Sequence, residues 1–186
     1  ELETPELMGN VENYEVFMGA IQDVSPVSFR FDEIPSGAKG YYSSEDKEIV
    51  IQERMSECQT MKTSIHEVTH AKLHDRDIME EMGEKKDKLT KEVEAESVAY
   101  IVCQYFGLDT SDYSFPYIAG WSSDKEMKEL RASMDTIRKT ASEFIDQMEE
   151  RMQELKKEVQ RHQEKALFEE ENDRYGIYQI QDGGKG

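Results

Sequence analysis

The chain has 186 residues, the length of one ordinary domain with an appendage. Its formal net charge of −18 argues against a nonspecific grip on nucleic acid or anionic lipid, and we expect neither a direct nucleic-acid contact nor membrane binding. Apolar residues make up 37% of the chain and charged residues 34%, which allows a modest core beneath a charged surface.

The first segments of the chain predict one helix and three strands. Residues 11–24 have an amphipathic pattern typical of a short helix, and residues 27–31 alternate as a strand does. Residues 41–53 then predict a hairpin, with its second strand near 47–53. We therefore expect a small antiparallel sheet.

A helix with a clear start signal follows the hairpin. Ser56 and Gln59 fit a capping box, in which each side chain satisfies a free backbone amide, and the helix should run to about Leu73. Residues 75–89 are charged and only weakly periodic, so they predict a loop or a frayed short helix.

Residues 90–107 predict a second firm helix. We expect Thr90 as its cap, an acidic first turn, and Gly107 at its end. Two cysteines, Cys58 and Cys103, form no metal-binding or disulfide pattern, which favours reduced thiols and a cytoplasmic location. The chain begins at Glu1 without a methionine, as an excerpt from a longer protein would.

A heptad-like apolar stripe over 127–159 predicts a long C-terminal helix. Its first half should pack on the domain. Beyond about Glu149 it should project into solvent as a charged linker, with helix-mediated self-association as the alternative. Residues 176–186 read as one strand and a turn. The expected organisation is a domain over 1–147, a charged helix over 148–175, and a tail or the start of a following domain over 176–186.

The most specific motif is His66-Glu67-Val68-Thr69-His70, which is HExxH. On a helix, His66 and His70 share one face, so both imidazoles can reach a single ion. Zinc usually takes three protein ligands in catalytic sites and leaves one position open for water. Glu67 cannot join the two histidines and points beside that open position, where a carboxylate can act as general base.

The third zinc ligand must come from elsewhere. His74 lies about 12 Å along the helix axis from His66, too far to share the ion. We expect it to complement the helix dipole with a partial positive charge, with a role at the edge of the cleft as the alternative. The next helix offers Glu92, Glu94 and Glu96. Glu92 and Glu96 share a face, so one could bind the metal while the other holds a ligand histidine, and Glu94 points away. The alternative is that all three simply enrich an acidic helix N-terminus.

These motifs resemble those of the gluzincin-type zinc metallopeptidases. The segments "HEVTH" and "EVEAESVAY" are similar to the metallopeptidase domain of ArdC-type antirestriction proteins and of ImmA/IrrE-like proteins of conjugative elements, over about 40–147. The resemblance implies an α+β, zincin-like fold, with an HExxH active-site helix, a second ligand-bearing helix and a long C-terminal helix. Thr69 departs from the glycine that is common before the second histidine.

The resemblance also assigns roles to individual residues. It implies that His66, His70 and Glu92 bind Zn²⁺, that Glu67 is the general base, and that Glu96 supports a ligand histidine. It further implies that the strand near 49–52 edges the cleft and pairs with an extended peptide. Candidate transition-state donors are three tyrosines: Tyr100, Tyr113 and Tyr117.

Two functions follow as hypotheses. The first is a zinc metallopeptidase, a hydrolase domain of a mobile-element or antirestriction protein acting on a peptide or protein substrate. The second is a non-catalytic module: a zincin-like domain whose zinc is structural, or an acidic mimic of DNA that binds a DNA-processing enzyme. The net charge of −18 motivates the second.

Overall fold

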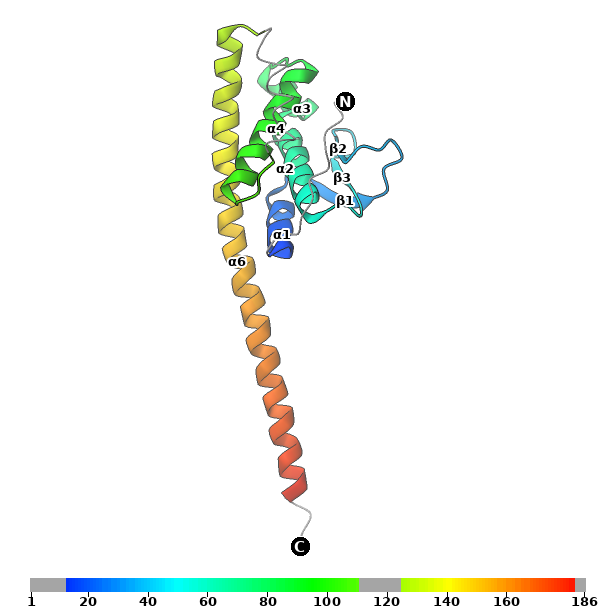
Figure 1. The fold of residues 1–186 in the computed structure, drawn as a ribbon, viewed down its shortest axis with the longest axis vertical. Helices are drawn as coiled ribbons and strands as arrows, with labels where there is room; N and C mark the ends of the chain where they lie inside the picture. The colour runs from blue at the N-terminus through cyan, green and yellow to red at the C-terminus, as the bar shows by residue number, and fades with distance from the viewer. Residues whose placement is uncertain (1–12, 111–124, 183–186) are drawn as a thin grey trace.

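The computed structural model describes residues 13–110 and 125–182 (Figure 1). The fold is α+β, with a small sheet, a layer of helices against it, and one very long C-terminal helix. The elements in chain order are α1 (Tyr14–Val24), β1 (Ser28–Asp32), β2 (Gly40–Ser43), β3 (Glu48–Gln52), α2 (Glu57–Leu73), α3 (Arg76–Met82), α4 (Lys88–Tyr105) and α6 (Met127–Asp182).

The three-stranded sheet is mixed, in the order β1-β3-β2. The hairpin of β2 and β3 is antiparallel as predicted, but β1 pairs with β3 in parallel, so the expectation of a purely antiparallel sheet is wrong. The reason lies in β3, where Ile49, Val50 and Ile51 are all buried. Such a continuous apolar run is typical of a central strand covered on both faces, and β1 pairs with the edge that the hairpin leaves open.

Because β3 is central, the expectation that the strand near 49–52 edges the cleft is also wrong. The edge strand on that side is β2, which lies against α2. The approach is close at Gly40, where an added Cβ would lie 2.8 Å from Cγ2 of Thr63. A larger residue at this position would therefore push the edge strand away from the HExxH helix.

Helix α2 runs as the capping signal predicts. The Ser56 hydroxyl accepts a hydrogen bond from the Gln59 amide at 3.1 Å. The helix lies at the centre of the molecule, between the sheet and α4 (Figure 1). Several of its polar residues are consequently buried, and buried polar side chains of this kind need partners or a function. They are Gln59, Thr60, Lys62, Thr63, Ser64, Glu67 and Thr69.

Helix α4 begins two residues earlier than predicted. Its N-cap is Asp87, whose carboxylate accepts from the Thr90 amide at 2.7 Å, so the prediction of Thr90 as cap is wrong. The first turn contains Lys88 and Lys91 and no acidic residue, which also corrects the expected acidic first turn. Aspartate is an N-cap at least as good as threonine, and its position three residues upstream sets the start. The predicted end is confirmed, with Gly107 at φ +82°.

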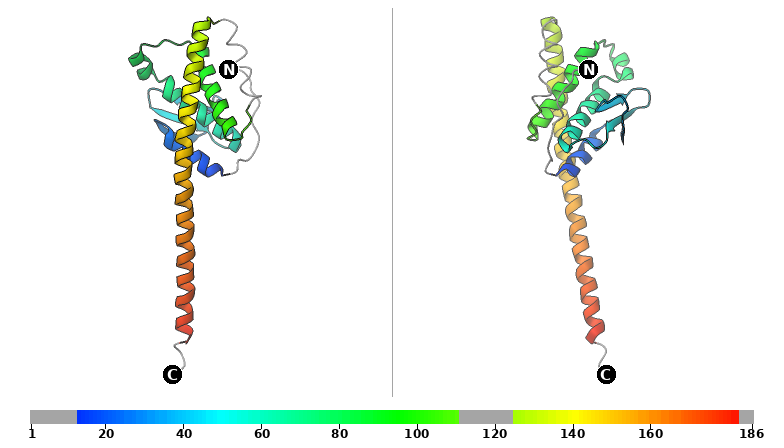
Figure 2. Two further views of the ribbon diagram at one scale, coloured as in Figure 1. Left: turned by 90° about the vertical axis from the view of Figure 1, so that its left-hand side faces the viewer. Right: turned by 45° about the vertical axis from the view of Figure 1, so that its right-hand side comes forward.

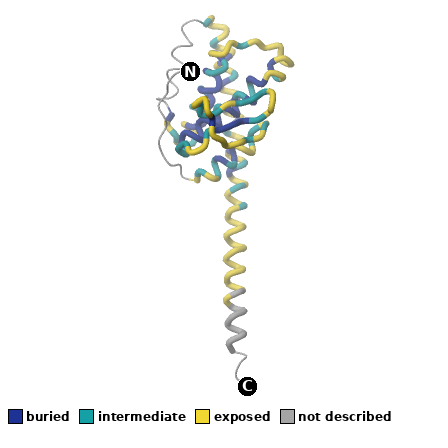
Figure 3. Tube along the Cα trace, turned by 90° about the vertical axis from the view of Figure 1, so that its right-hand side faces the viewer, coloured by how far each residue is buried: buried dark blue, intermediate teal, exposed yellow. Residues whose placement is uncertain are grey.

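The long helix α6 has 56 residues. Its first half packs along α4 and α1, and Phe144, Met148 and Met152 are buried there (Figures 1 and 2). Below this region the helix leaves the body and is exposed, as the yellow segment in Figure 3 shows. The predicted projection into solvent is thus confirmed, although packing extends slightly beyond Glu149. Self-association through this helix stays a prediction.

The strand predicted over 176–186 is wrong as far as residue 182, because α6 continues to Asp182. Aromatic and β-branched residues in 175–180 favour a strand locally, but extending an existing helix avoids the cost of nucleation. Residues 183–186 lie outside the described part. No helix among the described residues combines the length and apolar character needed to cross a membrane. Cys58 and Cys103 are both buried free thiols.

Asp75 joins the hairpin to the end of the HExxH helix. Its carboxylate accepts hydrogen bonds from the Tyr42 hydroxyl and from Nζ of Lys47, the latter at 2.7 Å. It also caps α3 by accepting from the amides of Asp77 and Ile78. Burial alone would raise the pKa of Asp75, but the Lys47 ammonium and the Tyr42 hydroxyl hold that pKa well below its usual range.

Asp75→Asn is expected to lower the free energy of unfolding at neutral pH by roughly 2–3 kcal/mol. Because the folded pKa is depressed, the carboxylate stabilises fully above its unfolded pKa of about 3.9, and its contribution is lost as pH falls further. Urea unfolding of both proteins without metal should show a difference in the free energy of unfolding that becomes smaller in acid. A difference in the free energy of unfolding that grows on acidification would refute this role for Asp75.

Candidate metal centre

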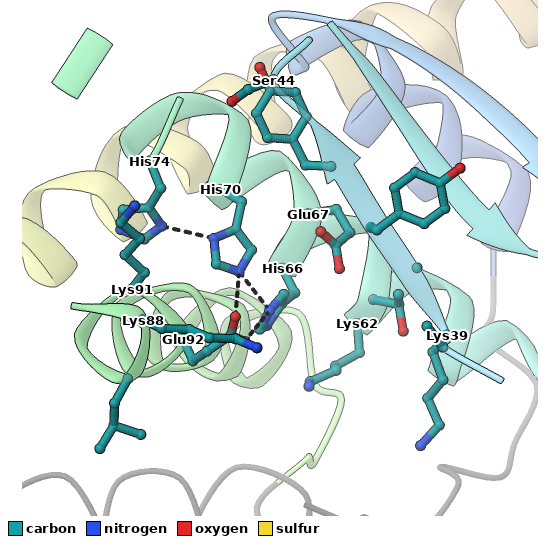
Figure 4. A pocket seen from close by; sticks show the side chains of 16 residues that line it. Lys39, Ser44, Lys62, His66, Glu67, His70, His74, Lys88, Lys91 and Glu92 are labelled. Carbon is teal, nitrogen blue, oxygen red and sulfur yellow. Dashed lines mark hydrogen bonds and ion pairs between the residues drawn. The ribbon is translucent and has the colours of Figure 1, made fainter. Parts of the chain in front are cut away.

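The HExxH helix α2 and the following helix α4 bring three candidate ligands together. His66 and His70 project from α2 toward Glu92 on α4 (Figure 4). The two Nε2 atoms are 3.0 Å apart. The Glu92 carboxylate oxygens lie 3.5 Å from Nε2 of His66 and 3.7 Å from Nε2 of His70. The structure therefore brings together the three residues that the resemblance implied as zinc ligands.

The other ring nitrogens of both histidines are already engaged. Nδ1 of His66 lies 3.0 Å from Glu96, and Nδ1 of His70 lies 2.9 Å from Nδ1 of His74. With Nδ1–H donating in each ring, both Nε2 atoms would offer a lone pair to a metal ion in the space beside Glu92. Hydrogen bonds of this kind fix the tautomer of a metal-binding histidine and its orientation.

The donor set fits zinc. Two imidazole nitrogens and one carboxylate are typical of catalytic zinc sites, which keep a fourth position open. Donor atoms about 2.0–2.1 Å from one tetrahedral ion stand roughly 3.3 Å from each other. The ligand atoms of the three residues all lie within 4.8 Å of one another, so small side-chain adjustments are enough for shared coordination.

Glu96 is buried between His66 and the ammonium of Lys62, which is 2.5 Å from the same carboxylate oxygen. Burial raises the pKa of Glu96, but the hydrogen bond from His66 and the nearby Lys62 charge lower it to about 2. Glu96 is thus an ionised hydrogen-bond partner for His66 at neutral pH. This matches the supporting position expected for it from the sequence.

Glu67 does not join the three candidate ligands. It lies on α2 beside His66, its residue is only 8% exposed, and its carboxylate projects into the pocket in Figure 4. This places a carboxylate next to the space that the two Nε2 atoms and Glu92 enclose. The location is the one that a general base for an attacking water requires.

His74 is the residue whose role differs most from expectation. It caps the end of α2, is buried, and lies with Nε2 2.9 Å from Glu94. Burial, which outweighs the hydrogen bond to Glu94, lowers the pKa of His74 to about 4. The ring is therefore neutral at pH 7, and the predicted positive charge at the helix end is wrong.

The neutral ring makes His74 a connecting group. Its Nδ1 can accept from Nδ1–H of His70 while its Nε2–H donates to Glu94. Glu94 also accepts from Ser133 of α6 at 2.7 Å and from Lys86 at 2.9 Å. Glu94 does point away from Glu92, as expected, and it contacts His74, which in turn contacts the candidate ligand His70. The sequence spacing is consistent with the contact between His70 and His74, because the two residues stand one helical turn apart.

His74→Ala is expected to weaken zinc binding by roughly 10–100-fold, because His70 loses the group that fixes its tautomer. Glu94→Gln should act in the same direction by disturbing the same chain. Competition with a chelating dye measures the affinity. The control is His162→Ala, which changes an exposed histidine on α6 far along the chain. An unchanged affinity in both His74→Ala and Glu94→Gln would contradict the connecting role.

The candidate metal centre opens into a pocket of about 830 Å³. Helix α2, the start of α4 and the segment containing β2 line it. Among the candidate transition-state donors, Tyr100 does not line this pocket. Tyr113 and Tyr117 lie outside the described residues. None of the three tyrosines is therefore assigned as a hydrogen-bond donor to the transition state.

Comparisons with known proteins give one informative relative. Over 126 residues the chain is 35% identical to an uncharacterized protein of Bacillus anthracis, a match that covers 67% of this chain. The chain spans about a fifth of that protein's length, 21%. No protein-family model matches the chain. No solved structure matches it either. Function must therefore be inferred from the geometry of the site.

Proposed function

We propose that the chain contains a zinc-dependent metallopeptidase domain with a zincin-like fold, of the antirestriction type that its motifs resemble. The observation behind the proposal is the convergence of His66, His70 and Glu92 on one small space, with Glu67 beside it in an open pocket. Both imidazoles have their Nδ1 atoms engaged elsewhere, which leaves the Nε2 atoms for a metal. A structural zinc site, by contrast, is usually closed by four protein ligands.

The chemistry divides between the metal and the protein. Zinc, when bound, supplies Lewis acidity that polarises a peptide carbonyl and lowers the pKa of water. Glu67 then accepts a proton from the attacking water and returns it to the leaving amine. His66 and His70 are held in place by Glu96 and His74. The described side chains thus supply ligands, a base and the supports that orient the ligands.

The position of β2 suggests how a substrate binds. The segment from Ala38 to Tyr42 lines the pocket wall, and β2 has an edge that no described strand occupies. An extended peptide can add to such an edge through main-chain hydrogen bonds. A peptide bound in this way would cross the pocket alongside α2, close to Glu67.

The test is metal-dependent cleavage of peptides. Purified protein is incubated with a proteome-derived peptide library, and new peptide termini are identified by mass spectrometry. Cleavage should disappear after treatment with a zinc chelator and return when zinc is restored. A library that stays intact in the presence of zinc, with the protein folded, would refute peptidase activity on unstructured substrates.

A further inference from the structure

We propose that this pocket selects acidic peptides, through the side chains of Lys88 and Lys91 beside the candidate metal ligands. The inference rests on the proposed function, because it names the substrate class of the same site. Its starting observation is that the pocket lining carries the opposite sign of charge to the chain as a whole. The chain has 41 acidic and 23 basic residues, yet the charged side chains that line the pocket are mostly basic. They are Lys39, Lys62, Lys88, Lys91, Glu67 and Glu92.

Both acidic side chains in the pocket are already committed. Glu92 faces the two imidazoles, and Glu67 is the proposed base. Among the basic ones, Lys62 is buried and paired with Glu96. The basic groups on which the inference rests are therefore Lys88 and Lys91, both at the start of α4. No described residue forms an ion pair with Lys88 or Lys91, so both ammonium groups are available for a ligand.

The positions of Lys88 and Lys91 do not serve the helix that holds them. Both lie in the first turn of α4, where free amide groups favour anionic side chains and disfavour cations. The fold thus accepts two unfavourable cations at the rim of the pocket. Departures from local preference of this kind are expected where a function requires them.

Lysines line both walls of the pocket around the candidate metal ligands. In Figure 4, Lys39 and Lys62 lie on one side of His66 and Glu92, and Lys88 and Lys91 lie on the other. Lys39 directly precedes the edge strand β2, and Lys88 begins α4 across the pocket. An extended peptide along β2 would therefore face the start of α4, where Lys88 and Lys91 can bind an acidic side chain.

The net charge of the chain does not oppose this selection at short range. Exposed charges are largely screened beyond a Debye length, which is about 8 Å at physiological ionic strength. A carboxylate inside the pocket responds mainly to the nearby lysines and to bound zinc. The acidic surface outside would discourage compact acidic proteins, so we expect the substrate to be an exposed, acidic, extended segment.

Peptide binding to zinc-loaded Glu67→Gln protein tests the inference without turnover. Fluorescein-labelled peptides of equal length carry Glu, Gln or Lys at otherwise matched positions, and fluorescence anisotropy gives their affinities. The Glu peptide should bind at least about tenfold more tightly than the Lys peptide. The double change Lys88→Gln and Lys91→Gln should remove about tenfold of that affinity. Lys156→Gln with Lys157→Gln, on the exposed part of α6, should not.

The outcomes separate the inference from the proposed function. Equal binding of the three peptides, or loss of affinity in the Lys156 and Lys157 control as well, overturns the inference. Cleavage by the wild type with no preference for acidic peptides also overturns it while supporting the metallopeptidase. Binding of the Glu peptide that depends on Lys88 and Lys91, without cleavage by the wild type, supports acidic recognition and overturns the proposed hydrolysis.

Discussion

Glu67→Gln is expected to lower peptide hydrolysis by roughly 10²–10⁴-fold while leaving the zinc content at the wild-type level. Glutamine keeps the shape of the side chain but cannot accept a proton from the attacking water. The histidines and Glu92 are untouched, so the metal ligands should remain in place. Measurement of kcat/KM on a cleaved peptide, together with zinc analysis of the same preparation, checks both halves of this expectation.

The matched control for Glu67→Gln is Glu81→Gln, which makes the same chemical change at an exposed position on α3. It should leave both hydrolysis and zinc content unchanged. If Glu67→Gln cleaved peptides at the wild-type rate, Glu67 would not be the base. If it lost zinc, its role would lie in forming the site and not in proton transfer. If the domain were instead a non-catalytic module, the Glu67→Gln protein would still bind its partner.

Glu92→Gln is expected to weaken zinc binding by more than about 100-fold. The change replaces the anionic carboxylate that faces both Nε2 atoms with a neutral amide oxygen, which is a much weaker zinc ligand. Glu96→Gln, which alters the hydrogen bond to His66 and the pairing with Lys62, should have a smaller effect of roughly 10–100-fold. Zinc affinities from dye competition give both values.

Glu80→Gln, an exposed change on α3, serves as the control for these carboxylate variants. The order of effects matters as much as their size. A loss of affinity that is greater for Glu96→Gln than for Glu92→Gln would reverse the assignment of ligand and support. Equal affinities in all three variants would remove α4 from the metal site.

The parts of the site that sequence could predict depend on local spacing. His66 and His70 stand one helical turn apart within a helix whose cap is recognisable at Ser56, so their shared face follows from helix geometry. The positions of Glu92 and Glu96 on one face of α4 follow in the same way. The choice of Glu92 as ligand came from the family resemblance, and the structure places it opposite both Nε2 atoms.

The parts that sequence could not predict depend on long-range packing. The neutral state of His74 results from burial at the end of α2, and its contact with Glu94 requires the docking of α4 and α6. The parallel pairing of β1 depends on the central position of β3, which strand propensity alone does not reveal. The position of Lys88 and Lys91 at the pocket depends on where α4 begins and on how it packs against α2, and sequence spacing gives neither.

Zinc analysis of the purified protein tests the metal centre most directly. Wild-type protein is loaded with zinc, freed of excess metal by gel filtration and measured by plasma mass spectrometry, beside a variant carrying His66→Ala and His70→Ala. We predict one zinc ion per wild-type chain and none in the double variant, with both proteins folded by circular dichroism. Absence of zinc from the wild type, or equal zinc in both proteins, would contradict a metal centre at His66, His70 and Glu92.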